Sequence, residues 1–474
     1  MEPIRYSDVL RATGGEPTGP VQGDPLIEGV TTDSRDVPPN SLFVPLRGPR
    51  FDGLAFMQQA FTRGASFSLV SADTAESRIP PNAIVVKDTV KALGDLARWH
   101  RSRFDVPVIG ITGSCGKTTV KEMLRLILGE DVVASRKSYN NEIGVPLTLL
   151  QMNRTTRAAI VEIGTNAPGE IAHLASIARP TVGILTNVEE AHLAGLGTVH
   201  GVMREKAALL EALPPSGAAI LNADNYYCRE IMEDLNSHAI TFGLWEDADI
   251  FGLEPTHTED GVEFLLYGKM PVDLRTLGMH NVSNALAAIA AGLWLGREPT
   301  AICEALRHFR APAMRMSKET VGPVTLINDA YNANPRSMDA AICELAARSC
   351  RGRRVAVLGE MMELGEKTER FHRSLGRKVA NEGIDVLWAV GPNGARMAEE
   401  ALRLGMHAEC VHSHATIEDA LDDPAFEPLP GDAWLFKASR SMALEHLAAQ
   451  VRERAAAIDP SAYDAMHRMQ RRRR

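Results

Sequence analysis

The chain has 474 residues, which at ~150 residues per domain predicts about three domains. Hydrophobic residues make up 45% and charged residues 23%, a composition typical of soluble globular proteins and unlike that of disordered or fibrous ones. The formal net charge is −9, and an acidic chain lacks the basic face that nucleic acid requires, so we expect no nucleic-acid partner. The basic run Arg471 to Arg474 is interpreted as part of a solvated tail, residues 461–474.

The sequence offers no candidate for a signal peptide or a membrane span. Its first ten residues carry Glu2, Arg5 and Asp8, and the longest nearly apolar run, 285–296, is far below the ~18 residues needed to cross a bilayer. The six cysteines are scattered without a Cys-x-x-Cys pair, so they predict neither a disulfide framework nor a zinc site. We therefore expect a cytoplasmic protein.

In chain order, the pattern divides into three α/β blocks. Residues 1–103 hold short apolar runs at 41–46 and 83–86 and a helical stretch at 54–64, which predict a small mixed α/β domain. Residues 104–312 hold buried-strand candidates at 106–112, 158–163, 181–186 and 218–222 and helical segments at 120–128, 202–213, 281–295 and 300–309. Residues 313–460 hold strand candidates at 324–329, 354–359, 386–391 and 433–437 and predict a Rossmann-like domain. Strands alternating with helical segments are typical of mostly parallel sheets.

The strongest local signal is a Gly-rich turn between a strand and a helix, Gly113-Ser114-Cys115-Gly116-Lys117-Thr118-Thr119. In such a loop, backbone N–H groups surround phosphate oxygens, Lys117 reaches the β- and γ-phosphates, and Thr118 offers a hydroxyl to Mg²⁺. The general pattern has a further glycine where this chain has Ile111, and the motif alone leaves ATP or GTP, and kinase or ligase, open. At the head of a helix, Cys115 is expected to have a depressed thiol pKa.

Further motifs lie on both sides of this loop. They are Thr32-Asp33-Ser34-Arg35, Tyr139-Asn140-Asn141, Glu162-Ile-Gly-Thr-Asn, Leu185-Thr-Asn-Val-Glu-Glu-Ala-His192, Gly278-Met-His-Asn281, Asn328-Asp329-Ala-Tyr331-Asn332-Ala-Asn334-Pro335, Leu358-Gly-Glu-Met-Met-Glu-Leu-Gly365 with His372, and Lys437-Ala-Ser439-Arg440. Together they resemble the Mur ligases, which join amino acids or peptides to the peptidoglycan precursor, over roughly residues 28–445. The resemblance implies a UDP-sugar-binding domain at 1–103, a P-loop ATPase at 104–312 and a ligand-binding domain at 313–460.

Within that family, the pairing of Asn140-Asn141 with Tyr331-Asn-Ala-Asn-Pro looks most like the member that adds D-alanyl-D-alanine to UDP-N-acetylmuramoyl-tripeptide. A sibling that adds a single amino acid, or a folate-type ligase, is the nearest alternative. A P-loop GTPase is disfavoured because the guanine-reading Asn-Lys-x-Asp motif is absent. Three positions depart from the family pattern: Ala438 replaces the usual Gly, Glu360 a common Asp, and Leu54 a frequent His.

The resemblance implies a two-step reaction. The tripeptide carboxylate attacks the γ-phosphate of ATP to give an acyl phosphate, from which the dipeptide amine then displaces phosphate. Because two anions meet in the first step, the site needs positive charge, which Lys117 and Mg²⁺ supply. By resemblance, Thr118 and Glu162 hold one Mg²⁺, and His192 and a carbamylated Lys206 hold a second; carbamylation requires a lowered lysine pKa.

The remaining site residues also come from the resemblance. Asn281 is expected to contact adenine, although an Asn at the start of a helix also fits an N-cap, and Arg315 and Asp329 are expected to reach the γ-phosphate and the ribose. Candidates for holding the UDP-sugar and the peptides are Asp33, Ser34, Arg35, Asn140, Asn141, Tyr331, Asn332, Asn334, Ser439 and Arg440. We expect a monomer whose domains close through hinges near 100–106 and 310–315, and an open form would hold Arg315 and Asp329 away from the phosphates.

Overall fold

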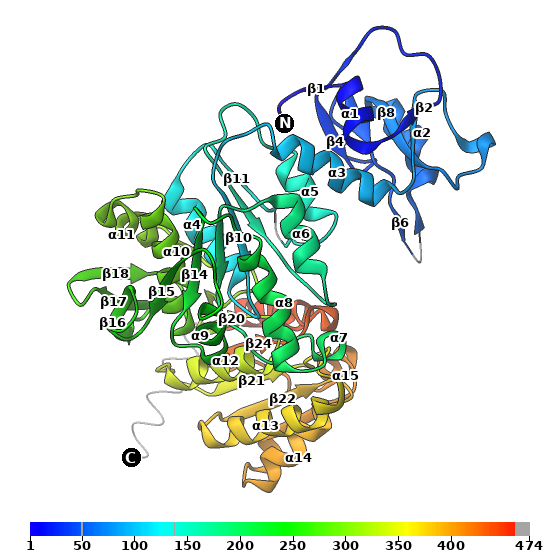
Figure 1. Cartoon of the computed structure of the whole chain (residues 1–474). Helices are drawn as coiled ribbons and strands as arrows, with labels where there is room; N and C mark the ends of the chain where they lie inside the picture. The colour runs from blue at the N-terminus through cyan, green and yellow to red at the C-terminus, as the bar shows by residue number, and fades with distance from the viewer. Residues whose placement is uncertain (49–50, 137, 460–474) are drawn as a thin grey trace.

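The computed structural model describes residues 1–48, 51–136 and 138–459, and the predicted basic tail at 461–474 lies outside them. Three large sheets follow one another along the chain, and the N-terminal part projects away from the other two (Figure 1). The prediction of a three-domain, mostly parallel α/β protein is confirmed. Within the described ranges, no helix combines the length and the apolar character needed to cross a membrane.

The N-terminal part is a small mixed sheet with helices packed beside it. The strand order is β2-β9-β8-β5-β4. The strands are β2 (Glu16–Pro17), β4 (Gly29–Thr31), β5 (Ser41–Phe43), β8 (Ala65–Ser71) and β9 (Ala83–Val86), with helices α1 (Tyr6–Thr13), α2 (Met57–Arg63) and α3 (Thr89–Arg101). The helix expected at 54–64 is split, because a 3₁₀ turn at Gly53–Phe56 precedes α2.

Helix α3 connects this part to the next. It packs against α1 and β8 on one side and against two helices of the central sheet on the other, α5 (Gly144–Leu149) and α6 (Glu170–Ala178). Buried Arg101, at its end, donates to the carbonyls of Ala178, Phe104 and Val106. These bonds hold the connecting segment against the central sheet.

The central part contains a nine-stranded sheet. Its order is β11-β12-β10-β13-β14-β15-β16-β17-β18, parallel up to β16 and antiparallel from there on. The strands are β10 (Val108–Thr112), β11 (Val132–Ala134), β12 (Ala158–Glu162), β13 (Val182–Leu185), β14 (Ala218–Asn222), β15 (His238–Gly243), β16 (Ile250–His257), β17 (Val262–Leu266) and β18 (Met270–Leu274).

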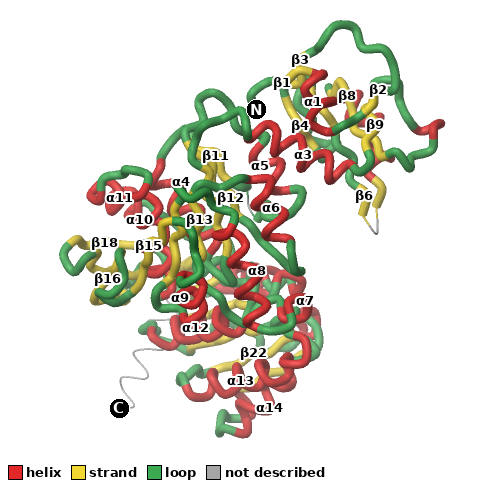
Figure 2. The backbone as a smooth tube through the Cα atoms, in the orientation of Figure 1, coloured by secondary structure: helices red, strands yellow, loops and turns green. Residues whose placement is uncertain are grey.

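Helices cover both faces of this sheet (Figure 2). Helices α4 (Lys117–Leu128), α10 (His280–Trp294) and α11 (Pro299–Arg307) pack on one face, and α6 and α8 (Val199–Glu211) on the other. Two shorter helices, α7 (Leu193–Leu196) and α9 (Tyr226–Met232), follow β13 and β14. The four central strands predicted from apolar runs are present, whereas β11 and β15 to β18 were not predicted.

The C-terminal part is a six-stranded, mostly parallel sheet with the order β19-β20-β24-β21-β22-β23. The strands are β19 (Ser317–Val321), β20 (Val324–Asn328), β21 (Arg354–Leu358), β22 (Val386–Val390), β23 (Val411–His414) and β24 (Ala433–Lys437). Helices α12 (Pro335–Ala347), α13 (Thr368–Asn381) and α14 (Gly394–Arg403) cover one face, and α15 (Ile417–Asp422) and α16 (Glu445–Ala456) the other.

The central and C-terminal parts share one apolar core. Buried residues from β13 and α8, such as Leu185 and Val202, belong to the same cluster as Ile327, Met338 and Leu364 of the C-terminal part. Such continuity fixes the two parts against each other. It also brings the carboxyl ends of β10 and β12 to face those of β20 and β24, where a parallel α/β sheet usually binds its ligand.

Candidate active site

The phosphate loop has the conformation that its glycines permit. Strand β10 ends at Thr112, and the chain passes through Gly113 (φ +149°) and Gly116 (φ +85°) before α4 begins at Lys117. A Cβ at Gly116 would lie 2.2 Å from Oδ1 of Asn284, so the loop also packs against α10 at this point. Because the first backbone N–H groups of α4 have no partner within their helix, they are available to an anion.

Lys117 and a buried carboxylate face each other beside this loop. The Lys117 ammonium donates to the Gly113 carbonyl at 2.6 Å, and burial lowers its pKa. Glu162, at the end of β12 and 1% exposed, accepts from Thr118 Oγ1 at 2.9 Å and from Asn140 Nδ2 at 3.0 Å. The predicted Thr118–Glu162 pair is therefore formed, and its oxygens are of the kind that Mg²⁺ prefers.

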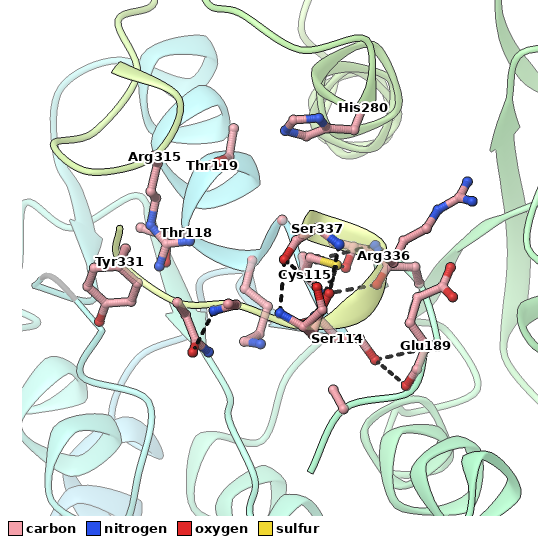
Figure 3. Close-up of a pocket in the computed structure, with 18 of the residues that line it drawn as sticks. Ser114, Cys115, Thr118, Thr119, Glu189, His280, Arg315, Tyr331, Arg336 and Ser337 are labelled. Atoms are coloured by element: carbon pink, nitrogen blue, oxygen red, sulfur yellow. Dashed lines mark hydrogen bonds between the residues drawn. The ribbon is translucent and has the colours of Figure 1, made fainter. Parts of the chain in front are cut away.

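Glu189, which sequence reasoning did not single out, lies on the other side of the loop. Its backbone N–H donates to Ser114 Oγ at 2.9 Å (Figure 3). Its carboxylate accepts from Asn225 at 3.3 Å. Burial raises the pKa of the Glu189 carboxyl. Its place in the Leu185–His192 motif was the available signal, but nothing in that pattern distinguished it from Glu190.

His192 lies at the contact between the central and C-terminal parts. Its backbone is left-handed (φ +54°), and its Nδ1 lies 2.5 Å from a carboxylate oxygen of Glu363. The backbone N–H of Ala194 donates to the Glu363 carbonyl, and Lys367 pairs with Glu190 at 3.0 Å. The segment after β13 thus docks onto the loop after β21.

Lys206 lies inside the protein, although a helix lysine is normally a solvated charge. It is 1% exposed on α8, and no hydrogen-bond partner for its ammonium occurs among the described residues. Burial and, next, repulsion from Lys117 lower its pKa to about 7. Lys206 is not among the residues that line the cleft.

The C-terminal part contributes an ion pair that is largely buried. Lys437, 2% exposed at the end of β24, donates to Asp329 Oδ2 at 2.6 Å and to the Asn332 carbonyl at 3.0 Å. Asp329 Oδ1 accepts from the backbone N–H of Met316 at 3.0 Å. The motif at 437–440 does not by itself indicate a role for Lys437, because its pairing with Asp329 spans more than a hundred residues of chain.

Arg315 and Tyr331 form the adjoining wall of the cleft. The Arg315 guanidinium lies 4.1 Å from the centre of the Tyr331 ring, and the Tyr331 hydroxyl donates to Ser138 of the central part. Figure 3 shows both side chains beside Thr118 and Thr119. Arg315 and Asp329 therefore line the same cleft as the phosphate loop, so the central and C-terminal parts are closed on each other.

Helix α10 borders the cleft with His280, Asn281 and Asn284. Asn281 is not the N-cap of this helix, because Met279 occupies that position; instead its side chain donates to the Leu277 carbonyl at 2.6 Å and accepts from Asn284 at 2.8 Å. The capping alternative for Asn281 is therefore wrong. Burial lowers the pKa of His280.

Together these residues enclose one cleft of about 1250 Å³ between the central and C-terminal parts. Among the predicted residues that line it are Ser114, Cys115, Gly116, Lys117, Thr118, Thr119, Asn140, Asn141, Glu162, His192, Asn281, Arg315, Asp329, Tyr331, Asn332, Asn334, Ser439 and Arg440. The volume exceeds the ~300–1,000 Å³ of a typical single-ligand pocket. It is therefore large enough for more than one substrate.

Several predicted substrate residues already serve the local fold. Asn141 accepts from the backbone N–H groups of Ile143 and Gly144, and Asn334 caps α12 while its amide lies 3.5 Å from the Ser114 carbonyl. Ser439 Oγ accepts from the N–H of Met362 at 2.9 Å. These bonds fix the loops that border the cleft.

The structure does not bring Asp33, Ser34 and Arg35 into this cleft. Arg35 forms a two-pronged bond to Asp33, at 2.9 and 2.8 Å, which lowers the Asp33 pKa to about 2. Ser34 donates to Gln59 at 2.8 Å. All three belong to the N-terminal part, which stands apart from the other two (Figure 1).

The pKa of the Cys115 thiol is shifted in the direction opposite to the one expected. The thiol lies 3.6 Å from Asn334 Nδ2, and burial raises its pKa. The predicted depression of this pKa is therefore wrong, because the closing C-terminal part desolvates the head of α4. A thiol kept protonated is a weak nucleophile.

Two departures from the family pattern have a structural explanation. A Cβ on Gly359 would lie 2.6 Å from the Cβ of Ala438, so a methyl group at 438 fits only because 359 is glycine. Glu360 accepts from both the backbone and the side chain of Asn393, at 2.6 and 2.8 Å. Nothing in the structure explains Leu54.

Comparison with known proteins agrees with this architecture. Family models match the chain in all three parts: the Mur ligase family catalytic domain at residues 26–101, the Mur ligase middle domain at 111–292 and the Mur ligase glutamate ligase domain at 314–440. The UDP-N-acetylmuramoyl-tripeptide–D-alanyl-D-alanine ligase of Bacillus subtilis is 35% identical over 446 residues, covering 93% of this chain and 96% of that protein.

Solved structures give the same result. The crystal structure of MurF from Acinetobacter baumannii matches with a TM-score of 0.85 and 31% identity, covering 96% of this chain and 99% of that one. MurF ligase from Thermotoga maritima, solved in complex with ADP, matches with a TM-score of 0.77 and 26% identity over 90% and 97% of the two chains. With the ordered motifs and the shared cleft, these matches show that the chain belongs to the Mur ligase family.

Proposed function

We propose that this protein is the ATP-dependent ligase that joins D-alanyl-D-alanine to UDP-N-acetylmuramoyl-tripeptide, through an acyl-phosphate intermediate. The observation that carries the proposal is that the phosphate-loop residues Lys117 and Thr118 and the C-terminal residues Arg315 and Asp329 line one closed cleft. Extensive similarity to ligases named for this reaction supports the choice of substrates.

The first step is attack of a carboxylate oxygen on the γ-phosphorus of ATP, with ADP leaving. Lys117 leaves the Gly113 carbonyl to contact the phosphates, and Arg315 adds a second positive charge from the opposite wall. In the second step the dipeptide nitrogen attacks the acyl carbon, phosphate leaves and the nitrogen loses a proton. Preorganised cations at the place where the two anions meet lower the barrier of the first step.

The residues beside the phosphate loop fit Mg²⁺. Thr118 Oγ1 and Glu162 would hold one ion, which when bound neutralises phosphate charge. For a second ion we propose His192 and Lys206. Glu363 engages Nδ1 of His192, which leaves Nε2 available as a ligand atom.

We propose that Lys206 acts as a carbamate. With a pKa near 7, a large fraction of this amine is uncharged at neutral pH, and the uncharged amine is the form that reacts with CO₂. The ammonium first loses one proton; the uncharged amine then forms an N–C bond with CO₂ and releases a second proton, so a buried cation becomes an anion. Repulsion between Lys206 and Lys117 then becomes attraction.

The remaining assignments complete the proposal. Asn281 would contact adenine, and Asp329 the ribose. Asp33, Ser34 and Arg35 would bind the UDP-sugar, and Asn140, Asn141, Tyr331, Asn332, Asn334, Ser439 and Arg440 the peptides. We propose domain limits of 1–103, 104–312 and 313–460.

Phosphate release from ATP tests this function. With UDP-N-acetylmuramoyl-tripeptide present, release should require D-alanyl-D-alanine and should fail with single amino acids. Release that depends instead on a single amino acid would support the assignment as an amide ligase but contradict the assignment of the dipeptide as substrate. Release without any tripeptide would contradict both.

A further inference from the structure

A cluster of metal-binding side chains lies in the C-terminal part, away from the cleft. His412 and His414 are two residues apart on the edge strand β23, so both project from the same face, while Ser413 between them is exposed. Asp423 follows α15 and lies over that face. Among the described residues, these three form a group whose ligand atoms all lie within 4.8 Å of one another.

The neighbouring strand fixes the orientation of both imidazoles. Trp388 of β22 is 1% exposed and pairs in register with His412. The His412 ring stacks on the indole at 3.9 Å with an interplanar angle of 6°, and the His414 ring lies at 5.5 Å and 13°. Both imidazoles are thus held nearly parallel to one rigid surface, which reduces the entropy lost when a ligand binds them.

The carboxylate is oriented as well. Asp423 Oδ1 accepts from the N–H of Ala425 at 2.8 Å, which directs Oδ2 toward the histidines. Oδ2 lies 3.2 Å from Nε2 of His414 and 3.7 Å from Nδ1 of His412. An ion pair alone explains this poorly, because both rings face the same oxygen, and the buried Nε2 of His414, although 3.2 Å from that oxygen, makes no well-aligned hydrogen bond to it.

We propose that His412, His414 and Asp423 form a binding site for a divalent transition-metal ion, best fitted by Zn²⁺. Two imidazole nitrogens and one carboxylate oxygen suit zinc, whereas Mg²⁺ and Ca²⁺ prefer oxygen ligands alone. The three side chains are 17–23% exposed, so water can complete the coordination shell. The nearby cation Arg353 is paired with Asp432 at 2.7 Å.

The position indicates what the metal does. It would tie the edge strand β23 to the segment after α15, at the border of the C-terminal sheet. None of its three ligands lines the cleft. The site therefore stabilises the C-terminal part, and it is independent of the proposed ligase activity.

The test uses the full-length protein, stripped of metal and titrated with Zn²⁺ against a chromophoric chelator. The wild type should bind one ion per chain at this site. The variants His414→Ala and Asp423→Asn should weaken binding by more than about tenfold, since loss of even an outer-shell partner costs that much. Zn²⁺ should also raise the Tm of the wild type but not that of D423N, which keeps the shape of Asp423.

Matched controls distinguish metal binding at this site from binding by other side chains. Cys410 is close in sequence, and His308 is an exposed histidine on the central part; C410S and H308A should bind Zn²⁺ like the wild type. With Co²⁺, the visible d–d bands should appear without a thiolate charge-transfer band. Absence of binding in the wild type, equal binding by D423N and H414A, or a thiolate band lost in C410S would each overturn the assignment.

Discussion

Lys117 occupies a position where its charge costs stability until a nucleotide arrives. The ammonium is desolvated and bonded only to the Gly113 carbonyl among the described residues, so its strongest partners are the phosphates of a bound nucleotide. The ammonium of Lys206 is desolvated as well, and among the described residues it has no hydrogen-bond partner. Substitution of each lysine therefore tests the role proposed for it.

Replacing Lys117 by Met should lower kcat by about 10²- to 10³-fold, the usual effect of removing one preorganised charge donor. The change keeps most of the side-chain volume and removes the desolvated charge, so the Tm of the nucleotide-free protein should not fall. Steady-state kinetics of phosphate release measures the effect. The control K91M removes an exposed lysine of α3 and should retain full activity; equal activity of K117M and the wild type would contradict the role.

Lys206 should make folding stability depend on pH. Its pKa falls from 10.5 to about 7 on folding, so between these values the unfolded state binds the proton more strongly and stability rises with pH. Relative to K206M, the free energy of unfolding of the wild type should therefore increase by up to about a few kcal/mol from pH 7 to pH 10. Urea unfolding in CO₂-free buffer at both pH values measures this, and identical pH dependence in the two proteins would contradict it.

At the scale of elements, the segment after β13 contacts the loop after β21, and this contact is expected to contribute to closure in addition to the shared apolar core. Glu363 bonds His192 through its side chain and Ala194 through its backbone. Because Glu363 is half-exposed, its ion pair is worth about 1 kcal/mol or less. E363A should thus shift closure by no more than roughly fivefold, visible as a larger radius of gyration in small-angle scattering.

A neighbouring glutamate serves as the control for this experiment. Glu366 is exposed and has no bond to the central part among the described residues, so E366A should scatter like the wild type. If E363A and E366A give the same scattering curve as the wild type, the Glu363 contact does not hold the closed arrangement.

The sequence predicts some elements much better than others. Strands β10, β12, β13 and β14 are buried on both faces and therefore appear as continuous apolar runs. Strands β16 to β18 are half-exposed, β19 is a polar edge strand, and β23 reads Val-His-Ser-His. None of these has the apolar pattern of a buried strand, so their pairing depends on tertiary context.

In the site, too, features that are local in sequence are predicted well and contacts between distant residues are not. The phosphate loop is local in sequence, and its glycines, lysine and threonine predict its geometry directly. The pairs Lys437–Asp329 and Glu363–His192 join residues that are more than a hundred positions apart. Burial decided the Cys115 pKa, and a sequence motif carries no information on how the C-terminal part covers the head of α4.

At the scale of the whole molecule, the N-terminal part stands away from the cleft and carries Asp33, Ser34 and Arg35 (Figure 1). If these residues bind the UDP-sugar, R35A should raise the KM for UDP-N-acetylmuramoyl-tripeptide roughly tenfold, the worth of one charge-assisted hydrogen bond. The KM for ATP should not change, because the proposed ATP site lies in the cleft.

The control for this prediction is R11A, which removes an exposed arginine of α1 paired with Asp8 in the same domain. It should leave both KM values unchanged. A rise in the KM for ATP in R35A, or an equal effect in R11A, would indicate a general disturbance of the domain rather than a binding role.

The proposed function is that this cleft joins a dipeptide to a UDP-linked tripeptide with hydrolysis of ATP to ADP and phosphate. The most direct test is mass spectrometry of the nucleotide product after incubation with ATP, UDP-N-acetylmuramoyl-tripeptide and an equimolar mixture of D-alanine and D-alanyl-D-alanine. The account predicts a product heavier by one dipeptide unit, formed by the wild type and strongly reduced in K117M. A product heavier by a single alanine, or equal product from K117M, would contradict it.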